Sequence, residues 1–230
     1  MYKMPQKLAA EFVGAFALVF FAAGSICADQ FLRTGGQAGI GLLGFALAHG
    51  LAMGILVTSL GPVSGGHFNP AITIGFWVTR KLSTIHTLAF WAAQLAGAAA
   101  AAYALRFLLP FDVWTAAQLG TPDLGSGISR TSGMIIEALL TFFLVFVFFA
   151  TAIELPGSFP RMAGWAIGLT ITMGALFGGP FTGAAFNPAR AFGPALATNH
   201  WNNHGVYWIG PLAGGVAAGW IYDMIFLKKE

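Results

Sequence analysis

The stretch AAFNPARAFG at residues 184–193 places an arginine, Arg190, two residues after a proline in a strongly apolar part of the chain. A second stretch, GHFNPAITIG at residues 66–75, repeats the tetrapeptide FNPA without the arginine. Asparagine before proline is a helix-start signal, because the asparagine oxygen caps the first backbone N–H groups and proline suits the first helical position. We therefore expect helices to begin at Asn69 and Asn187, with both side-chain NH₂ groups free to donate. A single NPA could be an ordinary capped helix, whereas two copies indicate a shared role.

The composition places the protein in a membrane. Of its 230 residues, 57% are hydrophobic and 8% are charged, against about 25% charged residues in a soluble domain. The net charge of +3 is too small to indicate a nucleic-acid partner, and the single cysteine, Cys27, excludes an intrachain disulfide or a cysteine-based metal site. We expect an all-α integral membrane protein surrounded by lipid.

Six stretches reach the ~20 apolar residues that cross a bilayer: 8–28, 38–60, 84–109, 131–153, 162–179 and 206–227. Two more, 69–78 and 187–197, are too short and would each run about 15 Å as helix. Half-length spans are tolerated only where protein or a water-filled cavity satisfies the loop backbone. The sequence therefore predicts six transmembrane helices and two re-entrant half-helices.

The two halves of the chain are related. AEFVGAFALVF (10–20) matches IEALLTFFLVF (136–146), FNPA occurs twice, and WAAQLAG (91–97) matches WIGPLAG (208–214), in the same order. We expect one domain over 1–230 with repeat halves of about 1–115 and 125–230. Each half holds three full spans, so the second copy must be inverted, and the half-helices must meet near the midplane with their positive N-terminal ends.

The basic residues predict the orientation. With both termini inside, the inner segments carry seven lysines and arginines: Lys3, Lys7, Arg80, Lys81, Arg161, Lys228 and Lys229. The outer segments carry Arg33, Arg106 and Arg130, with Arg190 set aside. We expect cytoplasmic termini in a prokaryotic cell (inner) membrane.

The two motifs, Asn69-Pro70-Ala71 and Asn187-Pro188-Ala189, their contexts SGGHFNPA and FNPARAFGP, and the duplicated glutamate segments resemble the aquaporin (major intrinsic protein) family over essentially the whole chain. The stretch 182–215 resembles the plant tonoplast-type subgroup and its bacterial relatives. The resemblance implies a right-handed bundle that assembles as a homotetramer, with one pore per subunit passing water or small neutral solutes. It implies no cofactor, no metal and no nucleic-acid partner, and we find no residue set that indicates an enzyme.

A charge at the depth of Arg190 is expensive and by default functional. In the family this arginine lines an outer constriction, donates to the solute and, with the helix dipoles, excludes protons and ions. The alternative is an arginine that packs against carbonyls. Offsets from the two NPA asparagines add His49, Ala175 and Ala184 to the constriction. Strict water channels have Phe and His at the first two positions, so this opening should be wider. His49 could instead be a buried interhelical histidine.

Other positions favour water over glycerol. Ala191 follows Arg190 where glycerol channels commonly have Asp, and Tyr207-Trp208 resembles water channels. We predict a passive water channel with a permissive filter. The alternatives are a channel mainly for ammonia, glycerol, urea, hydrogen peroxide or a metalloid acid, and an ion-coupled carrier.

The remaining polar residues of the spans have supporting roles in the family. Glu11 and Glu137 resemble buried carboxylates that organise the loop before each half-helix, although in a carrier they would bind protons. His67 should brace its loop. The loop backbone expected to line the pore is that of Gly65, Gly66, His67, Phe68, Gly183, Ala185 and Phe186.

Overall fold

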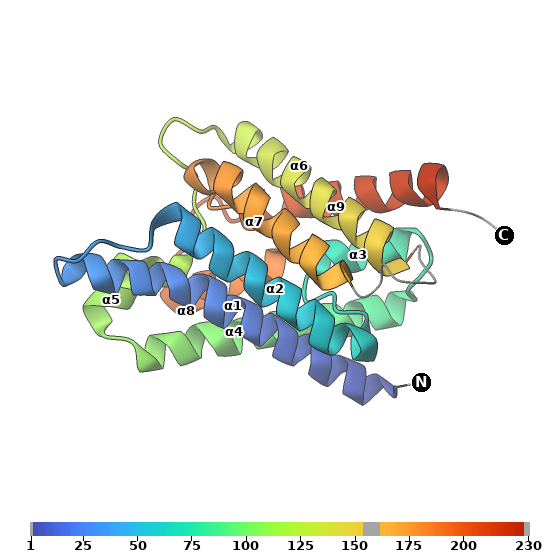
Figure 1. Ribbon diagram of the computed structural model, residues 1–230, viewed down its shortest axis with the longest axis horizontal. Helices are drawn as coiled ribbons and strands as arrows, with labels where there is room; N and C mark the ends of the chain where they lie inside the picture. The colour runs from blue at the N-terminus through green and yellow to red at the C-terminus, as the bar shows by residue number, and fades with distance from the viewer. Residues whose placement is uncertain (1, 154–161, 228–230) are drawn as a thin grey trace.

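Inside a membrane, helices satisfy their own backbone hydrogen bonds, and this chain uses them throughout. The computed structural model describes residues 2–153 and 162–227 (Figure 1). Within them, six helices are long and apolar enough to cross a membrane. They are α1 (Met4–Thr34), α2 (Gly41–Ser64), α4 (Thr84–Leu108), α6 (Arg130–Phe148, continued to Ile153), α7 (Ala163–Thr182) and α9 (Val206–Ile221, continued to Phe226).

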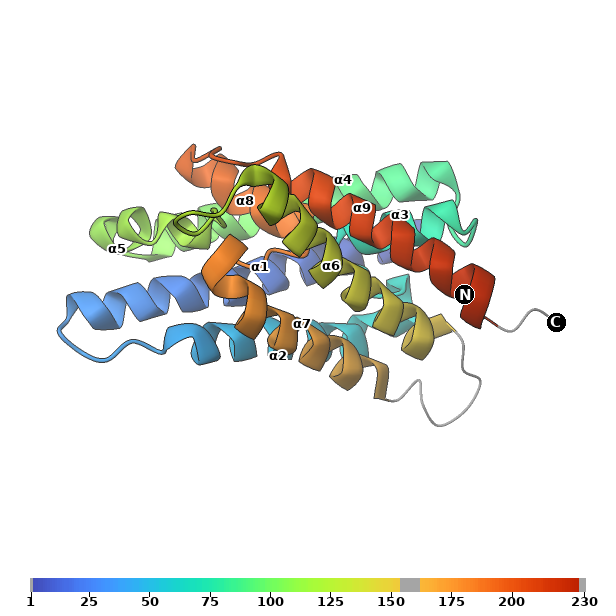
Figure 2. The same ribbon diagram turned by 90° about the horizontal axis from the view of Figure 1, so that it is seen from above.

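Two half-length helices complete the bundle. Helix α3 (Pro70–Val78) and helix α8 (Pro188–Thr198) have 9 and 11 residues. They lie in opposite halves of the bundle, as both views show (Figures 1 and 2). Helix α3 packs against α9, and α8 packs against α4, so each contacts a helix from the other half of the chain. The predicted fold class, six membrane helices and two half-helices, is confirmed.

The first helix is longer than the expected span of 8–28. Asp29 ends the apolar run but not the helix, because its carboxylate pairs with Arg33 one turn later, at 2.7 Å. The helix stops only before Gly35 and Gly36, where Gly36 has a φ of +74°. The length of the apolar run therefore underestimated the length of the helix, which continues through a pair of oppositely charged residues.

A short helix, α5 (Phe111–Ala116), was not predicted. It follows Pro110 and leads into a 3-10 turn over Gln118–Gly120, at the end of the bundle opposite to the start of α1 (Figure 1). Six residues are too few to show a helical period in the sequence. This segment matters because it lies against α8 and α1.

Glycines allow the long helices to approach closely. A Cβ at Gly97 of α4 would overlap the carbonyl of Phe12 on α1, and one at Gly214 of α9 would overlap the carbonyl of Ala138 on α6. Gly97 and Gly214 occupy the same position of the duplicated WAAQLAG and WIGPLAG segments. Small residues at such crossings permit the backbone packing that holds membrane helices together.

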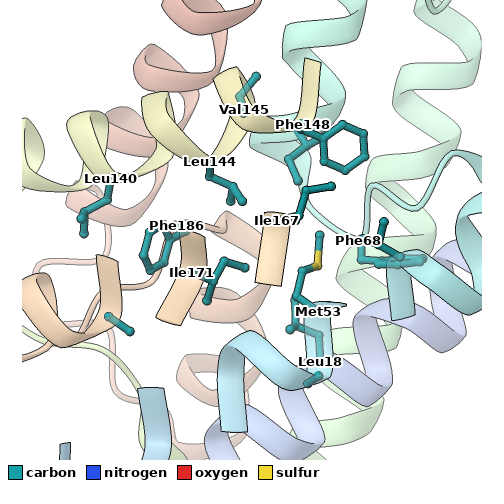
Figure 3. Close-up of a cluster of buried hydrophobic side chains, with 14 of the residues drawn as sticks. Leu18, Met53, Phe68, Leu140, Leu144, Val145, Phe148, Ile167, Ile171 and Phe186 are labelled. Carbon is teal, nitrogen blue, oxygen red and sulfur yellow. The ribbon is translucent and has the colours of Figure 1, made fainter. Parts of the chain in front are cut away.

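The apolar core joins both halves of the chain. It contains Leu18 of α1, Met53 of α2, Leu144 of α6 and Ile171 of α7, together with a phenylalanine from each NPA loop. Figure 3 shows these two phenylalanines, Phe68 and Phe186, among the buried side chains of the cluster. The loops before the half-helices are thus anchored in the core.

The two ends of the described chain lie at the same end of the bundle. The start of α1 and the end of the helix that continues α9 are both on the right in Figure 1. At this end Lys81 pairs with Asp223 at 2.7 Å. Arg161, Lys228 and Lys229, which entered the orientation prediction, lie outside the described residues.

Replacing Gly97 or Gly214 by alanine should force α1 and α4, or α6 and α9, apart. Overpacking of this kind costs about 1–3 kcal/mol. We expect a lower apparent unfolding temperature of the purified protein in detergent. Gly205→Ala is the matched control, since a Cβ there meets nothing within 4 Å. Equal unfolding temperatures for Gly97→Ala and Gly205→Ala would contradict the packing argument.

Candidate functional site

The two NPA asparagines bind each other's loops. The side chain of Asn69 caps α3 by accepting from the Ala71 N–H at 2.8 Å, and its Nδ2 donates to the carbonyl of Phe186 at 3.0 Å. Asn187 accepts from the Ala189 N–H at 2.9 Å and donates to the carbonyl of Phe68 at 2.9 Å. We call these two crossed bonds the asparagine clasp.

Both NH₂ groups were expected to be free to donate, and in the clasp each donates to a carbonyl of the opposite loop. Each NH₂ group has two hydrogens, and the clasp uses one of them. One N–H per asparagine remains beside the meeting point of the two helix N-termini. The carbonyls of Phe68 and Phe186 face the opposite half-helix and accept these bonds, and the Phe186 carbonyl also accepts from the Thr141 hydroxyl at 3.3 Å.

Two buried carboxylates hold the loops that precede the half-helices. Glu137 accepts from the Thr182 hydroxyl at 2.7 Å and from the N–H groups of Ala185 and Phe186, both at 2.9 Å. Its exposed fraction is 0%. Glu137 is therefore buried against the loop that precedes α8.

Glu11 makes the equivalent contacts in the first half. It accepts from the Ser64 hydroxyl at 2.6 Å and from the N–H groups of His67 and Phe68 at 3.1 and 2.7 Å. It also accepts from the Gln94 side chain at 2.7 Å. Sequence reasoning missed Gln94, although a polar residue within the apolar WAAQLAG repeat was a signal that could have revealed it.

The loop backbones have left-handed conformations that few residues adopt. In the first loop φ is +104° at Gly65, +73° at Gly66 and +50° at Phe68. In the second loop Gly183, Ala184 and Phe186 have φ of +78°, +46° and +55°. Non-glycine residues persist there only when their surroundings fix them, which the carboxylates and the clasp do.

The carbonyls of these loops divide into two groups. Those of Phe68 and Phe186 belong to the clasp. Among hydrogen bonds of the described residues, none ends on the carbonyl of any other loop residue predicted to line the pore: Gly65, Gly66, His67, Gly183 and Ala185. Each loop therefore keeps carbonyls without a donor from the described residues.

The four predicted filter residues come from four segments. His49 lies on α2, Ala175 on α7, Ala184 in the second loop and Arg190 on α8, and all are at least 95% buried. The ring of His49 lies 6.1 Å from that of Phe186, in the second loop. Ala175 and Ala184 belong to the same buried cluster as Phe186.

The guanidinium of Arg190 is only partly satisfied. One of its terminal nitrogens donates to the Gly120 carbonyl at 2.7 Å. Its Nε is buried and has no partner among the described residues. An arginine that only packed against carbonyls would have its buried donors paired. The free donor favours an arginine that offers a hydrogen bond to a solute.

The Gly120 carbonyl was not predicted. It belongs to the 3-10 turn that follows α5, seventy residues before Arg190. A backbone acceptor leaves no trace in residue types, so only the fold reveals this contact.

His67 and His204, which are not among the predicted filter residues, make contacts within the protein. The ring of His67 packs against Phe76 with centroids 4.3 Å apart, and its Nδ1 is 3.1 Å from the Thr73 hydroxyl. His204, in the outer loop, accepts from the Trp208 indole N–H at 3.0 Å, and burial lowers the pKa of its side chain. Neither arrangement points to a ligand site.

Replacing Glu137 by glutamine should disrupt the second loop. The new NH₂ group would face the N–H groups of Ala185 or Phe186, which would lose an acceptor. An unsatisfied buried donor costs about 1–3 kcal/mol. We expect a lower unfolding temperature and less water flux per unit of inserted protein. Asp112→Asn, at an exposed carboxylate, is the control; an equally small effect of both changes would argue against the loop-holding role.

Known proteins are similar to this chain in sequence and in fold. Residues 1–222 match the family described as Major intrinsic protein. Aquaporin TIP4-4 of Zea mays is 40% identical over 223 residues, which cover 96% of this chain and 86% of the relative. Aquaporin TIP4-1 of Zea mays is 46% identical over 192 residues, covering 82% and 72%. The X-ray structure of the aquaglyceroporin from Plasmodium falciparum has the same fold, with a TM-score of 0.82, 22% identity and 97% of each chain covered.

Proposed function

Because the chain belongs to the major intrinsic protein family, we propose that it is a passive transmembrane water channel that excludes protons and ions. It is an integral multi-pass membrane protein of a channel family rather than an enzyme family. The relatives reported above carry the name aquaporin, which favours water over the other solutes considered.

The asparagine clasp is the observation that carries the proposal. It joins the N-termini of α3 and α8, so the positive ends of two helix dipoles and one remaining N–H of each asparagine converge. A water molecule passing there presents its oxygen to donors on both sides. Such a water cannot accept a proton from one neighbour while donating to the next, and cations meet a positive potential.

Arg190 adds a second barrier at the outer constriction. Its fixed positive charge repels cations, and its unpartnered Nε can donate to water. We propose that His49, Ala175 and Ala184 form the rest of this constriction. Two alanine side chains leave more room than the larger groups of a strict water filter, so small neutral solutes could follow water.

The carboxylate contacts speak against an ion-coupled carrier. A carrier needs a carboxylate that binds and releases protons during transport. Glu11 accepts four hydrogen bonds and Glu137 accepts three, all from donors that shape the loops. Protonation of either would remove acceptors that the loop backbone needs.

The arrangement in the membrane is also part of the proposal. We propose a single domain with inverted halves of about 1–115 and 125–230, supported by the equivalent contacts of Glu11 and Glu137. Cytoplasmic termini are supported by the seven inner basic residues against three outer ones. The homotetramer is proposed from family membership. The reported curated relatives are plant proteins, which gives no support to the expected prokaryotic inner membrane.

Stopped-flow light scattering on proteoliposomes tests the channel. Wild-type protein should raise water flux far above that of protein-free vesicles, without the proton leak that an internal pH dye reports. Arg190→Ala should keep water flux and increase the leak of protons or cations. Arg33→Ala removes the same charge from an exposed position and should change neither. Water flux equal to that of protein-free vesicles would refute the channel, and uptake driven by a proton gradient would establish the carrier.

The filter assignment is tested by a double change. His49→Phe with Ala175→His should narrow the constriction. Ala175→His adds a ring, and His49→Phe replaces a polar ring by an apolar one. The ratio of glycerol or urea permeability to water permeability should fall. His86→Phe, on the exposed start of α4, is the control. An unchanged solute profile in the double variant would show that His49 and Ala175 are not at the filter.

A further inference from the structure

The outer connection before α6 is tied to the loop that follows α8. Asp123 accepts from the Asn203 side chain at 2.8 Å through Oδ1 and lies 3.1 Å from His200 Nε2 through Oδ2. We call Asp123, His200 and Asn203 the outer clamp. Arg130, at the start of α6, donates to the Asn203 side-chain oxygen at 2.9 Å and thereby links the outer clamp to that helix.

The carboxylate of Asp123 suits this role. Partial burial alone would raise its pKa, but the hydrogen bonds from Asn203, from the Leu124 N–H and from His200 outweigh burial, and the pKa is lowered. Asp123 is therefore a charged acceptor at neutral pH, and hydrogen bonds to a charged acceptor are stronger than those between neutral groups.

Asp123 of the outer clamp lies three residues after Gly120, whose carbonyl accepts from Arg190. Gly120, which binds the guanidinium, ends a turn in which Gln118, Leu119 and Gly120 all have positive φ, at +48°, +47° and +64°. Left-handed residues in succession are costly for ordinary side chains. The turn is held by its own packing, since Leu119 is fully buried and Gly120 lies against Ala23 of α1, and by contacts of the segment that follows it.

Beyond Gly120, Pro122 is buried against Gly183, and polar contacts hold the rest of the segment. Thr121 approaches Thr198 at 3.4 Å between hydroxyls, a long distance for such a bond. The Gly125 N–H donates to the Phe181 carbonyl at 2.8 Å, beyond Asp123. Between these, Asp123 makes the side-chain contacts that fix the segment against the loop after α8.

We propose that Asp123 is a positioning residue for the selectivity filter: the outer clamp holds the turn so that the Gly120 carbonyl keeps the Arg190 guanidinium at the constriction. This inference rests on the proposed function of Arg190. Without the outer clamp the Gly120 carbonyl leaves its place and Arg190 loses its acceptor. The guanidinium then occupies a wider range of positions, and the constriction opens for solutes larger than water.

The experiment compares permeability ratios in reconstituted vesicles of the full chain. Urea and water permeability are measured on the same batch by stopped-flow scattering, so their ratio does not depend on the amount of inserted protein. Asp123→Ala should raise the urea-to-water ratio about fivefold, the factor that corresponds to losing one hydrogen bond. Asp123→Asn keeps one acceptor oxygen and should give a ratio between those of Asp123→Ala and the wild type.

Asp112→Ala is the matched control, because it removes a carboxylate from an exposed position on α5 in the same outer region. Its ratio should equal that of the wild type. Should Asp123→Ala not be recovered from membranes, His200→Ala and Asn203→Ala each remove one donor from the outer clamp and should raise the ratio in the same direction.

The outcomes separate the two proposals. Wild-type vesicles without water flux would overturn the channel function and this inference with it. Wild-type flux, with Asp123→Ala lowering urea and water permeability in the same proportion, would overturn the positioning role alone and leave Asp123 as a structural residue. A raised ratio in Asp123→Ala, absent in Asp112→Ala, supports the inference.

Discussion

A helix that begins in the middle of a membrane exposes backbone donors at its N-terminus that no lipid can satisfy. The asparagine clasp solves this problem for both half-helices at once. Each asparagine caps its own helix with its oxygen and binds the other loop with its nitrogen. The loops can meet only because Glu11 and Glu137 take up their N–H groups from behind. The pore, its barrier to protons and the position of Arg190 all depend on this arrangement.

The duplicated motifs made most of the fold predictable from the sequence. Apolar length located the six spans, and Asn69-Pro70 and Asn187-Pro188 located the half-helix starts at the residues where the structure begins them. The two glutamates were identified because they interrupt apolar spans at equivalent positions. The asparagines, prolines and glutamates share a property: each is a residue type that is costly in a membrane helix unless something specific compensates for it.

What the sequence did not reveal rests on contacts between distant segments, most of them with backbone carbonyls. The Gly120 carbonyl, the crossed acceptors Phe68 and Phe186, and the outer clamp at Asp123 have no signature in residue type or period. Helix α5 was missed because six residues are too few to show a helical pattern. The predicted length of α1 was too short because Asp29 pairs with Arg33 within the helix. Gln94 is the exception, since its polarity was visible in the sequence and its partner Glu11 was already a predicted site residue.

The repeat is most informative where its halves differ. The residue three positions after Asn187 is Arg190, whereas the residue three positions after Asn69 is Ile72, which is fully buried. The inner half instead carries His67 in its loop, Thr73 on α3 and Gln94 on α4 in one network with Glu11. Their counterparts in the second half are Ala185, Ala191 and Pro211. Among the described residues the inner half thus keeps an unpartnered acceptor, Gln94 Oε1, whereas the outer half keeps a charge with an unpartnered donor, Arg190 Nε. Since solutes would cross both halves in series, one selective constriction is enough, and the unpartnered Nε of Arg190 supports the proposal that it lies on the side of α8.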